Sequence, residues 1–338
     1  MRRARPSMTD VGRAAQVSAQ TVSRYFTGQG YVSAATRARI AAAVDELGYH
    51  PNASARSFRS QRSSIVGVLT MGSLEFGSID ILTGLGRSAR THGYTLAITQ
   101  IEVGFEPTGW EDEAGRALAH FVSMPADGVI ILSPITGVED VVSEVTGETP
   151  VVVVSERPRE TAGSVGAHSY TAGVAATRHL IELGHREIAH VAGPATRNEA
   201  HERERGYRAA MAGAGLDPIV IAGASDWSAV SGYAAADHLG DVTGVFAVND
   251  EIALGVMSAM AQRGRMAPRD YSIVGVDDMP SAAYFSPPLT TMRLDFLTLG
   301  ARAFDVLADR IEGTSRSSDA PLEPALIVRA STGSPRGA

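Results

Sequence analysis

Hydrophobic positions in the first 50 residues follow a helical rather than a strand-like spacing. Apolar residues recur three or four positions apart in three segments, at residues 9–16, 19–27 and 34–47. This period places them on one face of a helix. Thr9, Ser18 and Ser33 stand where N-caps are expected, and Gly28 and Gly48 follow the second and third segments. The pattern predicts three short helices.

From residue 65 onward, short apolar runs alternate with longer helix-like stretches. The runs lie at residues 65–70, 94–101, 127–132, 150–155, 187–192, 244–248, 271–276 and 325–330. Strands that are apolar on both faces are typical of parallel sheets covered by helices. The elements are too numerous for one small sheet, so they predict two doubly wound lobes facing across a cleft.

Composition removes several classes of protein. The chain has 338 residues, 44% of them hydrophobic, and contains no cysteine. It has no apolar run near the roughly 20 residues that a membrane helix needs, and none follows Met1 as in a secretory signal. We therefore expect no membrane association, no disulfide and a cytoplasmic location.

The net charge of −7 hides an asymmetry. Residues 1–62 hold ten basic side chains and three acidic ones, a net +7, whereas the remainder carries −14. A basic head on an acidic body indicates a polyanion-binding module joined to a part that avoids polyanions.

The second predicted helix would expose a polar face to such a polyanion. Val22 and Phe26 occupy one side, which leaves Ala19, Gln20, Ser23 and Arg24 pointing outward. Gln and Arg pair with adenine and guanine edges, while hydroxyls suit phosphates. This arrangement predicts a helix-turn-helix domain whose second helix enters a DNA major groove.

Polar residues follow several predicted strands of the body. Asn249-Asp250, Asp277-Asp278 and Ser155-Glu156 each come directly after one. A cleft with such donors and acceptors suits a neutral polyhydroxy ligand. Trp227, in a polar loop, is either a core residue or a stacking platform for a sugar ring.

The head resembles the DNA-binding domain of the lactose-repressor/galactose-repressor family of bacterial regulators. The similarity rests on TDV at 9–11, VSAQTVSR at 17–24, VSAATR at 32–37 and GYHPN at 48–52. The body resembles the same family's effector-binding core, in the sugar-responsive branch, through GHR at 184–186, RERGY at 203–207, DWSAVSGY at 226–233, VND at 248–250 and PPLTTMR at 287–293.

The resemblance implies a sequence-specific transcriptional regulator, a homodimeric repressor that a sugar inducer releases from a pseudo-palindromic operator. Its periplasmic-binding-protein-like core would follow the all-α head, with boundaries at 1–50 (head), 51–64 (hinge helix and linker), 65–330 (two-lobed core) and 331–338 (tail). The hinge would insert Phe58 into the minor groove, although a plain linker is the alternative. No cofactor or metal is implied.

Site residues carry over from the family by position. The implied DNA-binding residues are Ser18, Ala19, Gln20, Thr21, Ser23, Arg24, Thr27, Ser33, Asn52, Arg56 and Phe58. The implied effector contacts are Phe76, Ser155, Glu156, His168, Glu199, Arg203, Trp227, Asn249 and Asp277, with Ser155 or Glu156 replacing the family's cleft aspartate.

Three further departures from the family are local. Gln16 stands in the turn where the family usually has glycine, and Thr27 stands where it usually has asparagine shortly after the recognition helix. Leu294 replaces a glutamine near the crossing between lobes.

Other classes lack their signals. Gly84 and Gly86 resemble a dinucleotide fingerprint but fall inside a predicted helix, and His185 and His190 lack metal-ligand spacing. A transport protein on the same fold would need a signal peptide and no DNA-binding head. An enzyme would need a catalytic motif, and none is present, so we expect no catalysis. The eight polar residues after Ala330 cannot form the leucine heptads of tetrameric members, which predicts a dimer.

Overall fold

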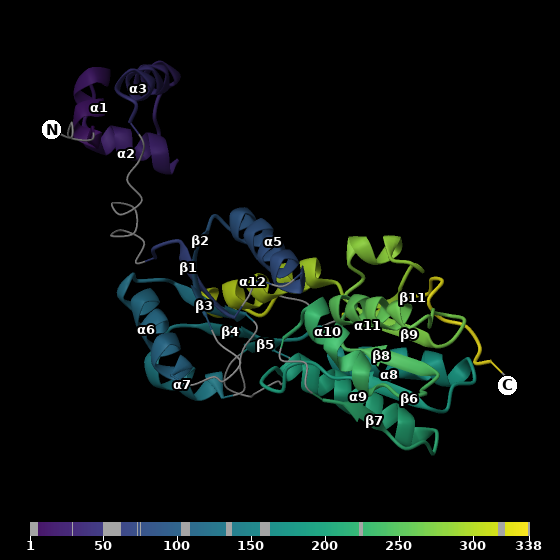
Figure 1. Cartoon of the computed structure of the whole chain (residues 1–338). Coiled ribbons are helices and arrows are strands. Elements are labelled where there is room, and N and C mark those ends of the chain that lie inside the picture. The colour runs from purple at the N-terminus through teal and green to yellow at the C-terminus, as the bar shows by residue number, and fades with distance from the viewer. Residues whose placement is uncertain are drawn as a thin grey trace. The chain divides into compact units, whose positions relative to one another are not determined.

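A computed structural model of the chain describes residues 6–28, 30–49, 62–72, 74, 76–102, 109–132, 137–155, 163–222, 226–316 and 322–336. It divides into two compact units, residues 1–63 and 64–338, named the head and the body below. Figure 1 shows the elements of each.

The head contains three helices, α1 (Met8–Ala15), α2 (Ala19–Thr27) and α3 (Ala34–Leu47). Ser18 and Ser33 cap α2 and α3, because each side chain accepts a hydrogen bond from the backbone N–H three residues later. Gly28 and Gly48 end these helices in the left-handed conformation that glycine tolerates best. Both helices and their caps confirm the prediction.

The N-cap of α1 differs from the prediction. Ser7, not Thr9, caps this helix: its hydroxyl accepts from the Asp10 N–H at 3.3 Å, and the Asp10 carboxylate accepts from the Ser7 N–H at 2.9 Å. This reciprocal capping box satisfies two backbone donors at once, which Thr9 has no partner to do.

The head has its own hydrophobic core. Val11, Val22 and Ile40, one from each helix, are fully buried, and Tyr49 closes the cluster. The Phe26 and Tyr49 rings lie with their centroids 5.8 Å apart. This shared core fixes α2 against the other two helices.

The body contains two separate sheets. The first has five parallel strands in the order β2-β1-β3-β4-β5, with bounds β1 Ile65–Met71, β2 Thr95–Ile101, β3 Gly128–Leu132, β4 Val151–Val154 and β5 Gly163–Val165. The second has six strands in the order β11-β10-β9-β8-β6-β7, with bounds β6 Ile188–Val191, β7 Ile219–Ile221, β8 Gly244–Ala247, β9 Ser272–Val276, β10 Thr290–Arg293 and β11 Ala325–Ile327. Only the β10–β11 pair is antiparallel.

Helices cover both sheets (Figure 1). Those of the first lobe are α5 Phe76–Thr91, α6 Trp110–Ser123, α7 Val138–Val145 and α12 Phe296–Glu312. Those of the second are α8 Ser169–Glu182, α9 Asn198–Gly213, α10 Ala229–Ala235 and α11 Asp250–Gln262, with the short 3-10 helices η1 Ala236–His238 and η2 Pro280–Tyr284. The predicted pair of doubly wound lobes is confirmed. The strands β5, β7 and β10 were not predicted: β5 (GSV) and β10 (TTMR) contain no apolar run, and β7 spans only three residues.

The chain passes between the lobes three times, after β5, after β10 and after α12. As a result α12, which lies in sequence between β10 and β11 of the second sheet, packs on the first lobe. A side chain at Gly84 would lie 2.0 Å from the Leu297 carbonyl oxygen, so α5 and α12 meet backbone to backbone. Gly84 is therefore a packing glycine within a helix, as its predicted position indicated.

The last residues also belong to the second lobe. Ser331 is fully buried; its hydroxyl donates to the Ile273 carbonyl at 2.6 Å and accepts from the Thr290 N–H at 2.8 Å.

Within the described residues, no helix combines the length and apolarity needed to cross a membrane.

Candidate functional site

The exposed face of α2 presents Gln20 and Arg24 to solvent. Ser23 does not share this face: it is buried, so the prediction that it points outward is wrong. The stripe that α2 packs against the head core is centred on Val22 and Phe26 and is wide enough to include the position after Val22. The polar surface of α2 is therefore narrower than predicted.

Two of the predicted hydroxyl contacts, Ser18 and Ser33, already serve as helix caps, and a third, Thr21, is bound to the first of these caps. The Ser18 hydroxyl lies 2.9 Å from that of Thr21, and Ser33 donates to the Thr36 hydroxyl at 2.9 Å. They fix the N-termini of α2 and α3, which carry partial positive charge that favours phosphate. Ala19 is half-buried. The side chain of Thr27, and the whole of Asn52, Arg56 and Phe58, lie outside the described residues, so these four stay predictions.

The departure at Gln16 falls in the turn between α1 and α2. Gln16 has φ 54° and ψ 45°, the left-handed conformation, at the C-terminus of α1. A residue with a Cβ pays about 1–2 kcal/mol for this conformation, and glycine does not. The departure from the family therefore leaves the turn intact but strained.

In the body, Arg203 of α9 joins two strand ends. Its Nη1 donates to the Val248 carbonyl, after β8, at 2.7 Å, and its Nη2 lies 3.4 Å from Asp277 Oδ1, after β9. The guanidinium is buried, and its Nε has no acceptor among the described residues. A buried guanidinium with a long ion pair and an unused donor retains hydrogen-bonding capacity for a ligand oxygen.

Trp227 lies beside this guanidinium. The Arg203 Cζ is 5.7 Å from the centroid of the indole, and Trp227 is half-buried against the core of the second lobe. Asp226 anchors its loop by accepting from the Ser228 N–H and hydroxyl at 2.9 and 2.6 Å. Burial acts to raise the pKa of Asp226, but the hydrogen bonds from Ser228 and Ser231 outweigh it and lower the pKa. Trp227 is thus partly core and partly exposed.

Asn249 holds the same loop from the other side. Its Nδ2 donates to the Trp227 carbonyl at 3.1 Å, while its Oδ1 caps α11 by accepting from the Ile252 N–H at 2.8 Å. Arg203, Trp227, Asn249 and Asp277, named the Arg203 cluster, are therefore brought together at the carboxyl ends of β8 and β9. This is where an α/β sheet gathers ligand-binding groups.

Ser155 follows β4 of the first lobe and contacts the second. The Asn198 Nδ2 donates to its hydroxyl at 3.4 Å, and the neighbouring Arg197 donates to the Met71 carbonyl at 3.0 Å. Neither Arg197 nor Asn198 was predicted, because no local pattern marks a contact between lobes. Glu156, the alternative to Ser155, lies outside the described residues.

Three other predicted contacts are half-buried on separate elements. Phe76 begins α5 and packs partly against the core, and Glu199 lies in the first turn of α9. His168 precedes α8 with φ 59°, a conformation rare for a residue other than glycine. Their roles stay predictions. Leu294 is buried between β10 and α12, so it contributes to the core at the crossing.

His185 and His190 have structural partners. The His185 Nε2 lies 2.9 Å from the Gly333 carbonyl, and burial is the main cause of its lowered pKa. No group of three metal-binding side chains occurs among the described residues.

A helix-turn-helix head joined to two parallel α/β lobes, with a polar cluster at the strand ends, defines a ligand-responsive DNA-binding regulator. Residues 7–52 match the model of the bacterial regulatory proteins, lacI family, and residues 177–332 match the periplasmic binding protein-like domain.

Relatives of known function match over nearly the whole chain. The ribose operon repressor of Escherichia coli is 32% identical, over 96% of this chain and 99% of that one. The HTH-type transcriptional repressor PurR of Vibrio campbellii is 31% identical, over 96% and 97%.

Solved structures agree. The lac repressor dimer bound to operator and the anti-inducer ONPF has a TM-score of 0.89 at 27% identity, over 98% of this chain and 100% of that one. A complex of the transcriptional regulator CelR with cellobiose has a TM-score of 0.70 at 30% identity, over 97% and 100%. The chain belongs to the lacI family of bacterial regulatory proteins, and it is a DNA-binding transcriptional repressor and not an enzyme.

Proposed function

We propose that the chain is a repressor that a sugar releases from its operator. The observation that carries the proposal is the Arg203 cluster, which combines a buried cation, a carboxylate, an amide and an indole. Arg203 and Asp277 can bind hydroxyl groups as donor and acceptor, and Trp227 can stack on the apolar face of a pyranose or furanose ring. The ribose operon repressor and the CelR-cellobiose complex carry sugar names, which supports this choice of ligand.

On the DNA side, α2 would enter the major groove. Gln20 and Arg24 are the exposed side chains of α2 with the chemistry to contact base edges or phosphates. Phe58 would enter the minor groove at the centre of a pseudo-palindromic site, with Asn52 and Arg56 on the flanking backbone.

A homodimer would present two such heads, and the body offers apolar surface for it. Val230 of α10 and Tyr284 of η2 are 78% and 88% exposed, and Ile79 of α5 and Ile98 of β2 are each 54% exposed. Burial of these side chains against a partner chain would stabilise the dimer through the hydrophobic effect. A sugar that prefers one lobe arrangement would shift the dimer's populations and weaken operator binding; by linkage, DNA would weaken sugar binding to the same degree.

The test separates the two sites with paired variants. Melting of the full chain is first screened against D-ribose, cellobiose, other mono- and disaccharides and free nucleobases, because a ligand that binds only the native state raises the melting temperature. Arg24→Gln is expected to weaken operator binding and lower its salt dependence by about one counterion, with sugar binding unchanged. Arg203→Met is expected to abolish the sugar response and spare operator binding.

The controls decide between outcomes. A nucleobase as the only stabilising ligand would contradict the sugar proposal while retaining the site, since an indole also stacks on a planar base. Release of operator DNA by a sugar from Arg203→Met, as from the wild type, would show that the site lies elsewhere.

A further inference from the structure

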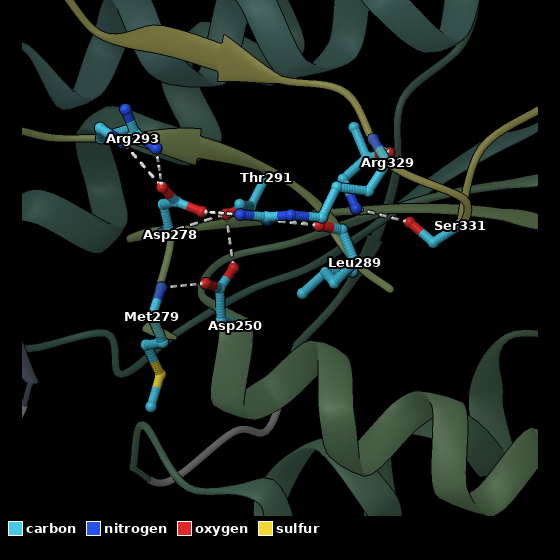
Figure 2. A network of polar contacts seen from close by, with 9 residues as sticks. Asp250, Asp278, Met279, Leu289, Thr291, Arg293, Arg329 and Ser331 are labelled. Atoms are coloured by element: carbon cyan, nitrogen blue, oxygen red, sulfur yellow. Dashed lines mark hydrogen bonds and ion pairs between the residues drawn. The ribbon is translucent and has the colours of Figure 1, made fainter. Parts of the chain in front are cut away.

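Two acidic residues adjoin the Arg203 cluster in sequence but belong to a different network. Asp250 follows Asn249, and Asp278 follows Asp277. Figure 2 shows both in a set of polar contacts that joins the start of α11 to β10 and to the segment after β11.

Asp250 binds backbone and hydroxyl donors from the neighbouring strand ends. Its side chain is fully buried; Oδ2 accepts from the Met279 N–H at 2.8 Å and Oδ1 from the Thr291 hydroxyl at 2.6 Å. The same Thr291 oxygen accepts from the Asp278 N–H at 3.3 Å. Asp250 therefore holds the backbone N–H groups of both residues that follow Asp277: that of Met279 directly, and that of Asp278 through the Thr291 hydroxyl.

The segment held in this way has an unfavourable backbone. Asp277 and Asp278 have φ of 113° and 50°, and each such conformation costs about 1–3 kcal/mol unless the surroundings impose it. The Asp277 N–H donates to the Met292 carbonyl at 2.8 Å. Three consecutive N–H groups, those of residues 277, 278 and 279, thus have fixed acceptors.

Asp278 is fixed through its side chain as well. Figure 2 shows its carboxylate between Arg293 and Arg329. Its Oδ2 lies 2.6 Å from the Arg293 guanidinium, its Oδ1 accepts from Arg329, and its side chain is only 6% exposed. The two arginines come from β10 and from the segment after β11. Asp278 is therefore engaged by other parts of the lobe, which leaves Asp277 as the member of the pair that contacts Arg203.

Because Gly275 has no side chain, the Asp250 carboxylate can approach the backbone of β9 closely. A side chain at Gly275 would lie 2.3 Å from Asp250 Oδ1, so the carboxylate packs directly on the backbone of β9. Burial, with the negative charge of Asp277 as a second cause, raises the pKa of Asp250 well above its usual range. A buried carboxyl group costs free energy, and here it meets two hydrogen-bond donors of the site's framework.

We infer that Asp250 is a positioning residue for the effector site: with Thr291 it fixes the strained turn that aims Asp277, and it touches no effector itself. The inference rests on the proposed function, since it takes Asp277 to contact the effector. Small displacements of a ligand-binding group are costly, so loss of this support should weaken binding through Asp277 alone.

The first test needs no effector. Hydrogen exchange in the full chain is compared between the wild type and Thr291→Val, which keeps the side-chain volume, and Asp250→Ala. The inference predicts exchange at least about tenfold faster at amides 278 and 279, with β6 and β8 unchanged. Unchanged exchange at these two amides in both variants would overturn it.

The second test is a thermodynamic cycle on binding of the stabilising probe from the screen, such as D-ribose or cellobiose. Thr291→Val is expected to raise the Kd about tenfold in the wild-type background and less than about twofold in the Asp277→Asn background, because the two residues act through one contact. Equal losses in both backgrounds would mean a merely structural role and would overturn the inference. Asp270→Ala is the matched control, since Asp270 also accepts from a loop N–H, that of Met266 at 2.8 Å. The Asp270→Ala variant should bind the probe with the Kd of the wild type.

The two proposals fail separately. A wild-type chain that binds none of the sugars contradicts the proposed function, whereas the exchange experiment still decides whether Asp250 and Thr291 hold the turn.

Discussion

His190 provides a quantitative test of the packing in the second lobe. Its ring is fully buried between Tyr207 and Phe246, with centroid distances of 5.2 and 4.7 Å. The Nδ1 lies 3.0 Å from the Phe246 carbonyl, and the Nε2 has no hydrogen-bond partner among the described residues. Burial therefore lowers the pKa of His190 from 6.5 to about 4, and the Phe246 carbonyl offsets only part of this effect.

The free energy of unfolding follows from this shift. At about 1.36 kcal/mol per pKa unit, a fall from 6.5 to about 4 corresponds to about 3 kcal/mol. The unfolded chain binds the proton more tightly, so acid favours unfolding. The contribution of the neutral His190 to the free energy of unfolding is complete above pH 6.5, declines as the pH falls and is lost once the pH is below about 4.

His190→Phe keeps a ring in the stack and removes the titration. Urea unfolding of the body is followed by the fluorescence of Trp110 and Trp227, both of which lie there. We expect the stability of the wild type to fall by about 3 kcal/mol more than that of the variant between pH 7 and 4. His238→Gln, at an exposed position, should follow the wild type. The reasoning would be refuted if, between pH 7 and 4, the free energy of unfolding of the wild type fell by less than about 1 kcal/mol more than that of His190→Phe.

Two further predictions concern backbone conformation. Gln16→Gly should stabilise the head by about 1 kcal/mol, because glycine avoids the strain of the left-handed conformation, and amides of α1 to α3 that open only with the head should then exchange about fivefold more slowly. Gly84→Ala should destabilise the body by about 1–3 kcal/mol in urea unfolding, since its Cβ would meet the Leu297 carbonyl. Gly86→Ala, where the nearest atom within reach is a flexible Arg90 nitrogen at 3.5 Å, is the control and should be neutral or stabilising.

Local signals in the sequence predicted the local structure well. Ser18 and Ser33 stand directly before apolar stripes, and both cap the helices that follow. Ser7 rather than Thr9 caps α1 because the Asp10 carboxylate accepts a hydrogen bond from the Ser7 N–H. Apolar runs predicted most of the strands, whereas β5 (GSV) and β10 (TTMR) contain no such run and left no signal.

Long-range partners could not be predicted in the same way. The resemblance to the family placed Arg203 and Asp277 in one site, and the structure brings them together. Nothing local distinguishes Asp277, which contacts Arg203, from Asp278, which binds two arginines of distant segments. Likewise, Asn249 looked like a ligand-binding amide, but much of its capacity serves the α11 cap and the Trp227 loop.

Because the chain passes between the lobes three times, its connectivity also determines the order in which the parts of the protein can fold during synthesis. The core of the head ends at Tyr49, so this unit can fold as soon as its residues leave the ribosome. The first lobe needs α12 to cover α5, and the second needs Ser331, so neither is complete until almost the whole 338-residue chain exists. At about 5–20 residues per second, this interval lasts about 15–60 s. Every newly made chain therefore displays a finished DNA-binding head for that time without its α/β body.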